Sequence, residues 1–254
     1  MITIQMKDLT PNNMELSISP MLELAGGLHL LTQQFVHHLH QACQTELLQM
    51  VKQEELYQEF LYFSPLFSDG IPDLFLPNYS DGVLEWEDQF EYLYQIDLDL
   101  FISSCNRAFI HYTDRRPGIF CSLEEDYLFD PEHLFNRFLL FMSSYMRLVF
   151  WSAWNNQYPV LMTMKEQLRN YLSQSSDNVS HFLHALVPDC KTNGENETLL
   201  LPSLYTPVAH QDSVLRLRFY ISWYLRQPLF CFSLHHTNSL VVSFPSLLFR
   251  HPSK

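Results

Sequence analysis

The feature that most limits how this chain folds is a heavy load of aromatic side chains set against very few glycines. The 254 residues include 20 Phe, 13 Tyr and 4 Trp but only 6 Gly, and 47% of the residues are apolar. Linkers and disordered chains have the opposite composition, because they lack the apolar groups that a core needs. A chain of this length buries about 70–75% of the surface that its unfolded form exposes. We therefore expect a packed globular protein that folds without disulfide bonds or metals.

The spacing of apolar residues predicts a mainly helical body in residues 1–190. Ser19-Pro20 is a favourable helix start, with a capping hydroxyl before a proline at the first helical position, and apolar residues then recur at helical spacing up to Leu39. Further helices are predicted over about 44–63, from Glu85, from Asp130-Pro131 to about 154, over 160–173 and over 176–186. The stretch 64–82 is predicted as an ordered loop held down by buried Phe67, Leu74 and Phe75.

The last 64 residues have a different composition. Residues 198–208 and 215–225 have an extended pattern, and 229–234 and 240–244 resemble a β-hairpin. The charge changes sign at the same place: residues 1–190 hold 25 acidic and 9 basic residues, and residues 191–254 hold 3 and 6. We expect an α+β protein with a helical body over 1–190 and a β-rich segment over 191–254 packed on it, forming one compact unit.

The net charge of −13 excludes some classes of partner. From Gln53 to Asn106 there are 12 acidic residues and no Lys or Arg, so this surface repels phosphate backbones and we expect no nucleic-acid binding. The five cysteines form no CxxC pair, which excludes a readable zinc ribbon or disulfide framework. No signal peptide or membrane span is recognisable, so a cytoplasmic protein without a membrane partner is expected.

Three histidines are the only candidate metal ligands. His29, His37 and His40 lie on one predicted helix and, at about 100° per residue, fall within about 80° of one another, so they share a face. Neutral imidazoles on such a face are suited to zinc. No carboxylate or thiolate is positioned by the sequence to complete a site, and we therefore favour partly exposed polar residues beside the core, with no bound cofactor.

No catalytic motif is present. Asp97 with Asp99, or Glu87 with Glu91, have the residue types for general acid–base catalysis. A run of unopposed acidic residues is more typical of a solvated face, and no nucleophile elbow, Walker loop, dinucleotide fingerprint or HExxH motif occurs. We expect a protein that is not an enzyme.

Four short motifs resemble the N-terminal domain of the long ArsR-type transcriptional regulators. They are Leu16-Ser17-Ile18-Ser19-Pro20-Met21-Leu22-Glu23-Leu24 with Leu28-His29-Leu30-Leu31, Tyr62-Phe63-Ser64-Pro65-Leu66-Phe67, Ile71-Pro72-Asp73-Leu74-Phe75, and Leu199-Leu200-Leu201-Pro202-Ser203-Leu204. Those regulators join a helical N-terminal domain to a C-terminal winged-helix domain that binds DNA. This chain reaches Lys254 without a basic recognition helix, so we expect no winged-helix domain in it. Smaller members of that family sense metals through Cys or His, a property with no matching cluster here.

The resemblance implies a sensor or interaction domain of a bacterial transcriptional regulator that lacks its own DNA-binding module. Its expected partner is a small apolar ligand or another protein. One alternative is a small hydrolase or metal-dependent enzyme that uses His29, His37 and His40 or the acidic stretch. A third is a structural partner that forms a homodimer through an exposed aromatic face.

Overall fold

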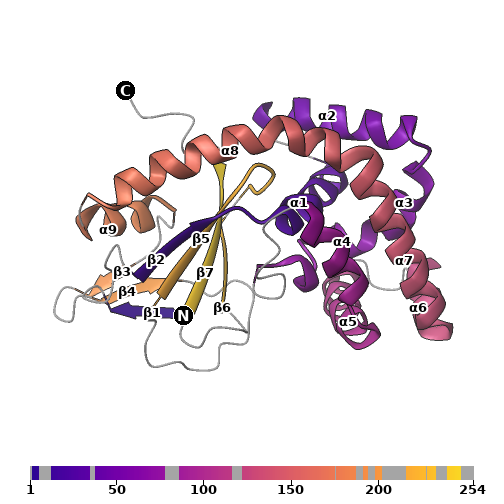
Figure 1. The fold of residues 1–254 in the computed structure, drawn as a ribbon. Helices are drawn as coiled ribbons and strands as arrows, with labels where there is room; N and C mark the ends of the chain where they lie inside the picture. Colours follow the sequence, from indigo (N-terminus) through magenta and orange to yellow (C-terminus); the bar gives the residue numbers. More distant parts are fainter. Residues whose placement is uncertain are drawn as a thin grey trace. The chain divides into compact units, whose positions relative to one another are not determined.

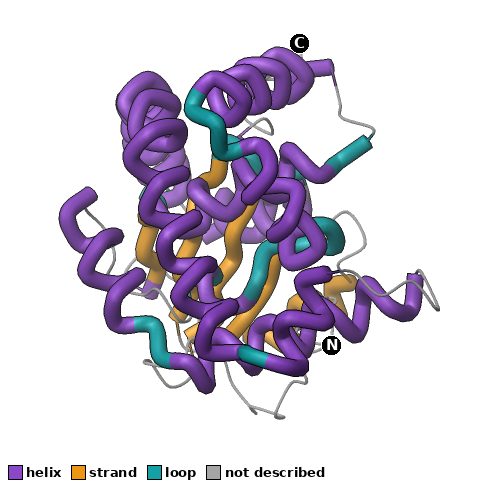
Figure 2. Tube along the Cα trace, turned by 90° about the vertical axis from the view of Figure 1, so that its right-hand side faces the viewer, coloured by secondary structure: helices purple, strands orange, loops and turns teal. Residues whose placement is uncertain are grey.

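The computed structural model of the chain describes residues 2–5, 13–34, 38–77, 86–115, 122–174, 176–186, 191–193, 198–201, 216–226, 228–232 and 239–246. Helices make up most of these residues and strands a smaller share (Figure 1, Figure 2). The predicted α+β class is confirmed, since a mainly helical body is followed by a small β-containing C-terminal segment.

The elements follow one another along the chain in a simple order. The helices are α1 (Pro20–Thr32), α2 (His38–Gln53), α3 (Tyr57–Phe67), the 3-10 turn η3 (Asp73–Phe75), α4 (Trp86–Gln95), α5 (Leu98–Arg115), α6 (Ser122–Phe129), α7 (Pro131–Tyr145), the π-helical turn η4 (Met146–Phe150), α8 (Trp151–Leu172) and α9 (Ser176–Leu186). The strands are β1 (Ile2–Gln5), β2 (Met14–Ser17), β3 (Lys191–Asn193), β4 (Thr198–Leu201), β5 (Arg216–Ser222), β6 (Leu229–Phe232) and β7 (Ser239–Pro245).

The chain divides into two compact units. The helical unit is Pro20–Gln157, and the sheet unit combines Met1–Ser19 with Tyr158–Lys254. The sequence-based division into 1–190 and 191–254 follows the change in composition, whereas these units follow the strand pairing, which joins N-terminal strands to C-terminal ones. Helix α8 begins in the helical unit and ends in the sheet unit.

Helix α1 lies at the centre of the helical unit. Ten of its 13 residues are buried, and it contacts α2, α3 and α4. A helix that is apolar all round in this way is a core helix. Its predicted start at Ser19-Pro20 is confirmed.

The aromatic residues of the helical unit form a connected core cluster around Phe138. The ring of this fully buried residue lies 4.9 Å from Phe101, 5.5 Å from Phe63 and 6.3 Å from Phe75, measured between centroids. Phe67, Leu74 and Phe75 are buried as predicted, but residues 64–67 belong to α3, so the predicted loop over 64–82 is wrong at its start. Tilted and edge-on pairs at these distances are favourable because of the ring quadrupoles.

Two small sheets form the β part of the sheet unit. One has the order β1-β4-β3 with antiparallel pairs, and the other has the order β2-β5-β7-β6, in which β2, β5 and β7 are parallel and β6 is antiparallel. The β6–β7 pair confirms the predicted hairpin. Phe182 of α9 packs on the second sheet, with its ring 5.3 Å from both Phe219 and Phe244.

The predicted helix from residue 20 through Leu39 is wrong, because α1 ends at Thr32 and α2 begins at His38. The end of α1 is held by side chains distant in the sequence. Gln44 Nε2 of α2 donates to the carbonyls of Leu30 (2.9 Å) and Gln33 (2.8 Å), and the Leu30 carbonyl also accepts from the Gln33 amide at 3.2 Å.

The predicted single helix over 44–63 is also wrong. Glu55 takes a left-handed backbone conformation with φ of 59°, and the Leu56 amide donates to the Val51 carbonyl at 3.0 Å. This is the hydrogen bond of a Schellman motif, which normally uses glycine at the left-handed position. Because glutamate at this position does not mark a helix end in the sequence, the sequence predicts one helix where the structure has two, α2 and α3.

Candidate functional site

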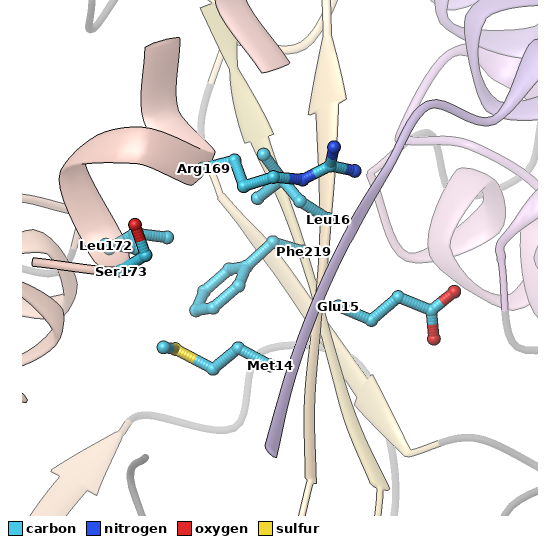
Figure 3. Close-up of a pocket in the computed structure, with 7 residues that line it drawn as sticks. All are labelled: Met14, Glu15, Leu16, Arg169, Leu172, Ser173 and Phe219. Carbon is cyan, nitrogen blue, oxygen red and sulfur yellow. The ribbon is translucent and has the colours of Figure 1, made fainter. Parts of the chain in front are cut away.

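A cavity of about 70 Å³ lies in the sheet unit, between β2, β5 and the C-terminal end of α8 (Figure 3). Its wall is mainly apolar, and its lining residues are Met14, Glu15, Leu16, Arg169, Leu172, Ser173 and Phe219. Phe219 and Leu172 are buried and form the floor, whereas Arg169 and Ser173 are exposed and form the rim.

Alternation along β2 decides which of its side chains face the cavity. Met14 and Leu16 point toward the Phe219 ring and α8, and Glu15 points away from them (Figure 3). Successive side chains of a strand lie on opposite faces of the sheet. Glu15 instead accepts from Arg218, its register partner on β5, at 2.9 Å between Oε2 and Nε. This pair holds β2 on the sheet, because the Arg218 side chain is only 10% exposed.

The rim of the cavity has one cationic side chain that is already paired. Arg169 Nη1 lies 2.9 Å from Glu166 Oε1 and 3.2 Å from Oε2, one turn earlier on α8. Both side chains are about half exposed, and an exposed pair of this kind contributes at most about 1 kcal/mol. The last carbonyls of α8 add partial negative charge beside it. A neutral group therefore fits this rim better than an anion.

The size of the cavity sets what it holds. A benzene-binding cavity in a protein core has about 150 Å³, so about 70 Å³ accepts only the end of a ligand, such as a short aliphatic chain. Its one hydroxyl, on Ser173, donates to the Asn170 carbonyl at 3.0 Å, and the one carboxylate of the lining, Glu15, points away and accepts from Arg218. The lining is suited to binding and has no nucleophile–base pair for catalysis.

The helical unit contains a separate polar cluster that joins α3, α6 and α7. Arg137 donates to both carboxylate oxygens of Glu59 at 2.9 Å, and its guanidinium carbon lies 3.6 Å from the centroid of the Tyr62 ring. The Tyr62 hydroxyl donates to Asp126. Burial, together with the Asp126 carboxylate, raises the pKa of Tyr62 far above its usual value. Each of these groups is bound to another member of the cluster, which identifies it as a structural clamp between the three helices.

Two of the three histidines considered as candidate metal ligands lie on different helices. His29 lies near the end of α1 and His40 lies on α2, while His37 lies outside the described residues. The His29 Nδ1 donates to the Phe67 carbonyl at 2.6 Å, which ties α1 to α3. Within the described ranges, no group of three His, Cys, Asp or Glu side chains is arranged to hold a metal ion.

The acidic residues considered for acid–base chemistry lie on exposed helix surfaces. Asp97 caps α5, accepting from the Leu100 amide at 2.7 Å, and Glu91 accepts from Gln95 at 3.0 Å. Asp99 and Glu87 are exposed as well. Capping and solvation account for these carboxylates.

The sequence alone does not identify the cavity residues, because they come from three separate segments, at 14–16, 169–173 and 219. One local signal was available: in Met14-Glu15-Leu16-Ser17 apolar and polar residues alternate, which is typical of a half-buried strand. No comparable signal links this strand to Arg169 or Phe219. Their proximity depends on the parallel pairing of β2 with β5.

Comparison with known proteins identifies one family. Residues 1–132, just over half of the 254, match the model of a family described as a family of unknown function, DUF5937. Neither the curated proteins nor the solved structures include a match. In the part of the chain that is described, no helix has both the length and the apolar character of a membrane span.

Proposed function

The chain belongs to the DUF5937 family of unknown function, and from this premise we propose that it is the sensor or interaction domain of a bacterial transcriptional regulator of the long ArsR type. Three of the four motifs that resemble those regulators, at 16–31, 62–67 and 71–75, fall inside the matched residues. DNA binding then belongs to a module attached to or associated with this chain, and the protein acts in the cytoplasm.

The observation that carries the proposal is the cavity beside the end of α8. Arg169 and Leu172 line it from the sheet unit, and the first residues of the same helix, Trp151–Gln157, belong to the helical unit. A ligand in the cavity therefore acts directly on an element that both units share. Signalling requires that the ligand bind two conformations of α8 with different affinity.

The ligand class follows from the lining. Met14, Leu16, Leu172 and Phe219 supply apolar contacts, and Glu166 with the α8 carbonyls disfavours a negative charge at the rim. We propose a neutral, mainly apolar small molecule that inserts one end into the cavity. Burial of a short aliphatic end contributes about 0.8 kcal/mol for each CH₂ group, so binding of the end alone is weak.

The binding test uses saturation-transfer NMR with 1-hexanol and hexanoate as matched neutral and anionic probes. We expect hexanol to bind more strongly, and Leu16→Trp, which fills the cavity, to abolish the signal. Val160→Trp, at an exposed position of α8, is the control and should bind as the unmodified chain does. Equal binding to the Leu16→Trp protein would refute the site.

Transmission is tested by hydrogen–deuterium exchange with hexanol present. The proposal predicts changed exchange near Arg169 and also near Trp154, at the other end of α8. A change confined to the cavity would show binding without signalling.

The DNA-related part of the proposal has its own test. A mobility-shift assay with random duplex DNA should show no binding by this chain, because its basic residues are few and scattered. In the gene, a basic winged-helix segment after Lys254, or an adjacent gene for one, is expected. Tight DNA binding by the 254-residue chain would contradict the assignment.

A further inference from the structure

The outer face of one long helix in the helical unit is exposed and apolar at its centre. Backbone angles stay helical where α7 passes into η4 and η4 into α8, so residues 131–156 form one continuous rod (Figure 1). Its inner face is buried in the unit core, through side chains such as Phe138, Met142 and Val149. Its outer face consists of the exposed residues Glu132, His133, Asn136, Leu140, Arg147, Leu148, Trp151, Ser152, Asn155 and Asn156.

Large apolar side chains on this outer face are unusually open to solvent. Leu140 is 71% exposed, Leu148 is 47% and Trp151 is 39%, and Phe129, just before the rod begins, is 87% exposed. Exposed apolar groups that gather on one helix face indicate a surface that binds another helix.

The charges on the same face are arranged symmetrically about Leu140. Glu132 lies eight residues before Leu140 and Arg147 lies seven residues after it, which at 1.5 Å per residue places them about 12 Å and about 10.5 Å away along the axis. At about 100° per residue, both lie on the same flank of Leu140. Within the described part of the chain, neither has an ion-pair partner.

This pattern is self-complementary in an antiparallel arrangement. A two-fold axis through Leu140 places Leu140 against the same residue of a second chain, and it places each Glu132 near the second chain's Arg147. In an isologous interface of this kind each contact occurs twice, because both chains present the same face. The opposite ends of the rod provide the charge complementarity, and the central leucine provides the apolar contact.

We infer that the outer face of residues 131–156 is a dimerisation surface, on which a second copy of this chain binds antiparallel about Leu140. The helix axes then lie about 8–10 Å apart, the usual distance for packed helices. This inference is independent of the proposed ligand and of DNA binding, because it depends only on the helical unit.

Sedimentation equilibrium of the full chain over a concentration series tests the inference. We expect a monomer–dimer equilibrium, and we expect Leu140→Asp to shift it at least tenfold toward monomer. Tyr94→Asp, on an equally exposed aromatic residue of α4 (68% exposed), is the control and should leave it unchanged. A chain that is monomeric at every concentration, or a dimer that survives Leu140→Asp, would overturn the inference.

Charge exchange distinguishes this interface from any other apolar contact. Glu132→Arg and Arg147→Glu should each weaken the dimer severalfold, since each places like charges together. The double variant Glu132→Arg/Arg147→Glu restores both pairs and should regain the dimer. If the double variant is no better than the two single ones, the antiparallel register is wrong. Both positions are exposed helix surface, so these variants are expected to fold.

Discussion

Replacing Phe138 with alanine tests whether the aromatic cluster supports the helical unit. Phe138 is fully buried and contacts Phe63, Phe75 and Phe101 at centroid distances of 4.9 to 6.3 Å. Truncation of a buried Phe to Ala costs about 3–5 kcal/mol, because transfer energy is lost and a cavity remains. Three aromatic neighbours that each contribute about 0.5–1.5 kcal/mol beyond buried area place this site at the upper end of that range. We therefore expect the free energy of unfolding to fall by about 4–5 kcal/mol.

The assay is equilibrium urea unfolding followed by far-UV circular dichroism. Tyr94→Ala is the matched control, because its side chain is 68% exposed and an exposed substitution changes stability by about 0.5 kcal/mol or less. Phe138→Leu keeps most of the volume and is the variant to measure if the alanine protein does not fold. A loss below about 1.5 kcal/mol for Phe138→Ala, or a loss equal to that of the control, would refute the role of the cluster.

Three further predictions concern single groups of the helical unit. Tyr145 is fully buried and its hydroxyl has no hydrogen-bond partner among the described residues. Tyr145→Phe should therefore raise the free energy of unfolding by about 1 kcal/mol. A loss of stability in urea unfolding would contradict this. Burial raises the pKa of Tyr145, so above about pH 10 the unfolded tyrosine ionises while the folded one keeps its proton. Stability should consequently fall as the pH rises, less steeply in Tyr145→Phe, as urea midpoints at pH 8 and pH 11 will show. The Asp130 carboxylate caps α7 by accepting from the His133 amide at 3.0 Å. Asp130→Ala should therefore lower the free energy of unfolding by about 1 kcal/mol, and Asp130→Asn should lower it much less. Equal losses of stability for the two variants in thermal unfolding would exclude the cap.

Local signals in the sequence account for the elements that were predicted correctly. Ser19-Pro20 and Asp130-Pro131 correctly predict the starts of α1 and α7, and at α7 the Asp130 side chain caps the helix beside a proline in its first turn. The β6–β7 hairpin is equally local, because its two strands are adjacent in the chain. The change of composition near residue 191 was enough to predict the α+β class.

Local signals of this kind do not predict the candidate site. Three separate segments contribute Met14, Phe219 and Leu172 to the cavity, and nothing within any one segment specifies the others. The premise that His29, His37 and His40 share one helix is wrong for a similar reason, since α1 ends at Thr32 and His40 lies on α2. The Gln44 side chain that satisfies the α1 carbonyls belongs to the following helix.

The sequence by itself determined the apolar core, the starts of α1 and α7, the hairpin and the class of the fold, because each depends on composition or on neighbours a few residues away. Only the tertiary structure decided the joining of β2 to β5 and the division into units that α8 links. Those features depend on hydrogen bonds and packing between distant segments, whose free energy exists only when the whole chain has folded.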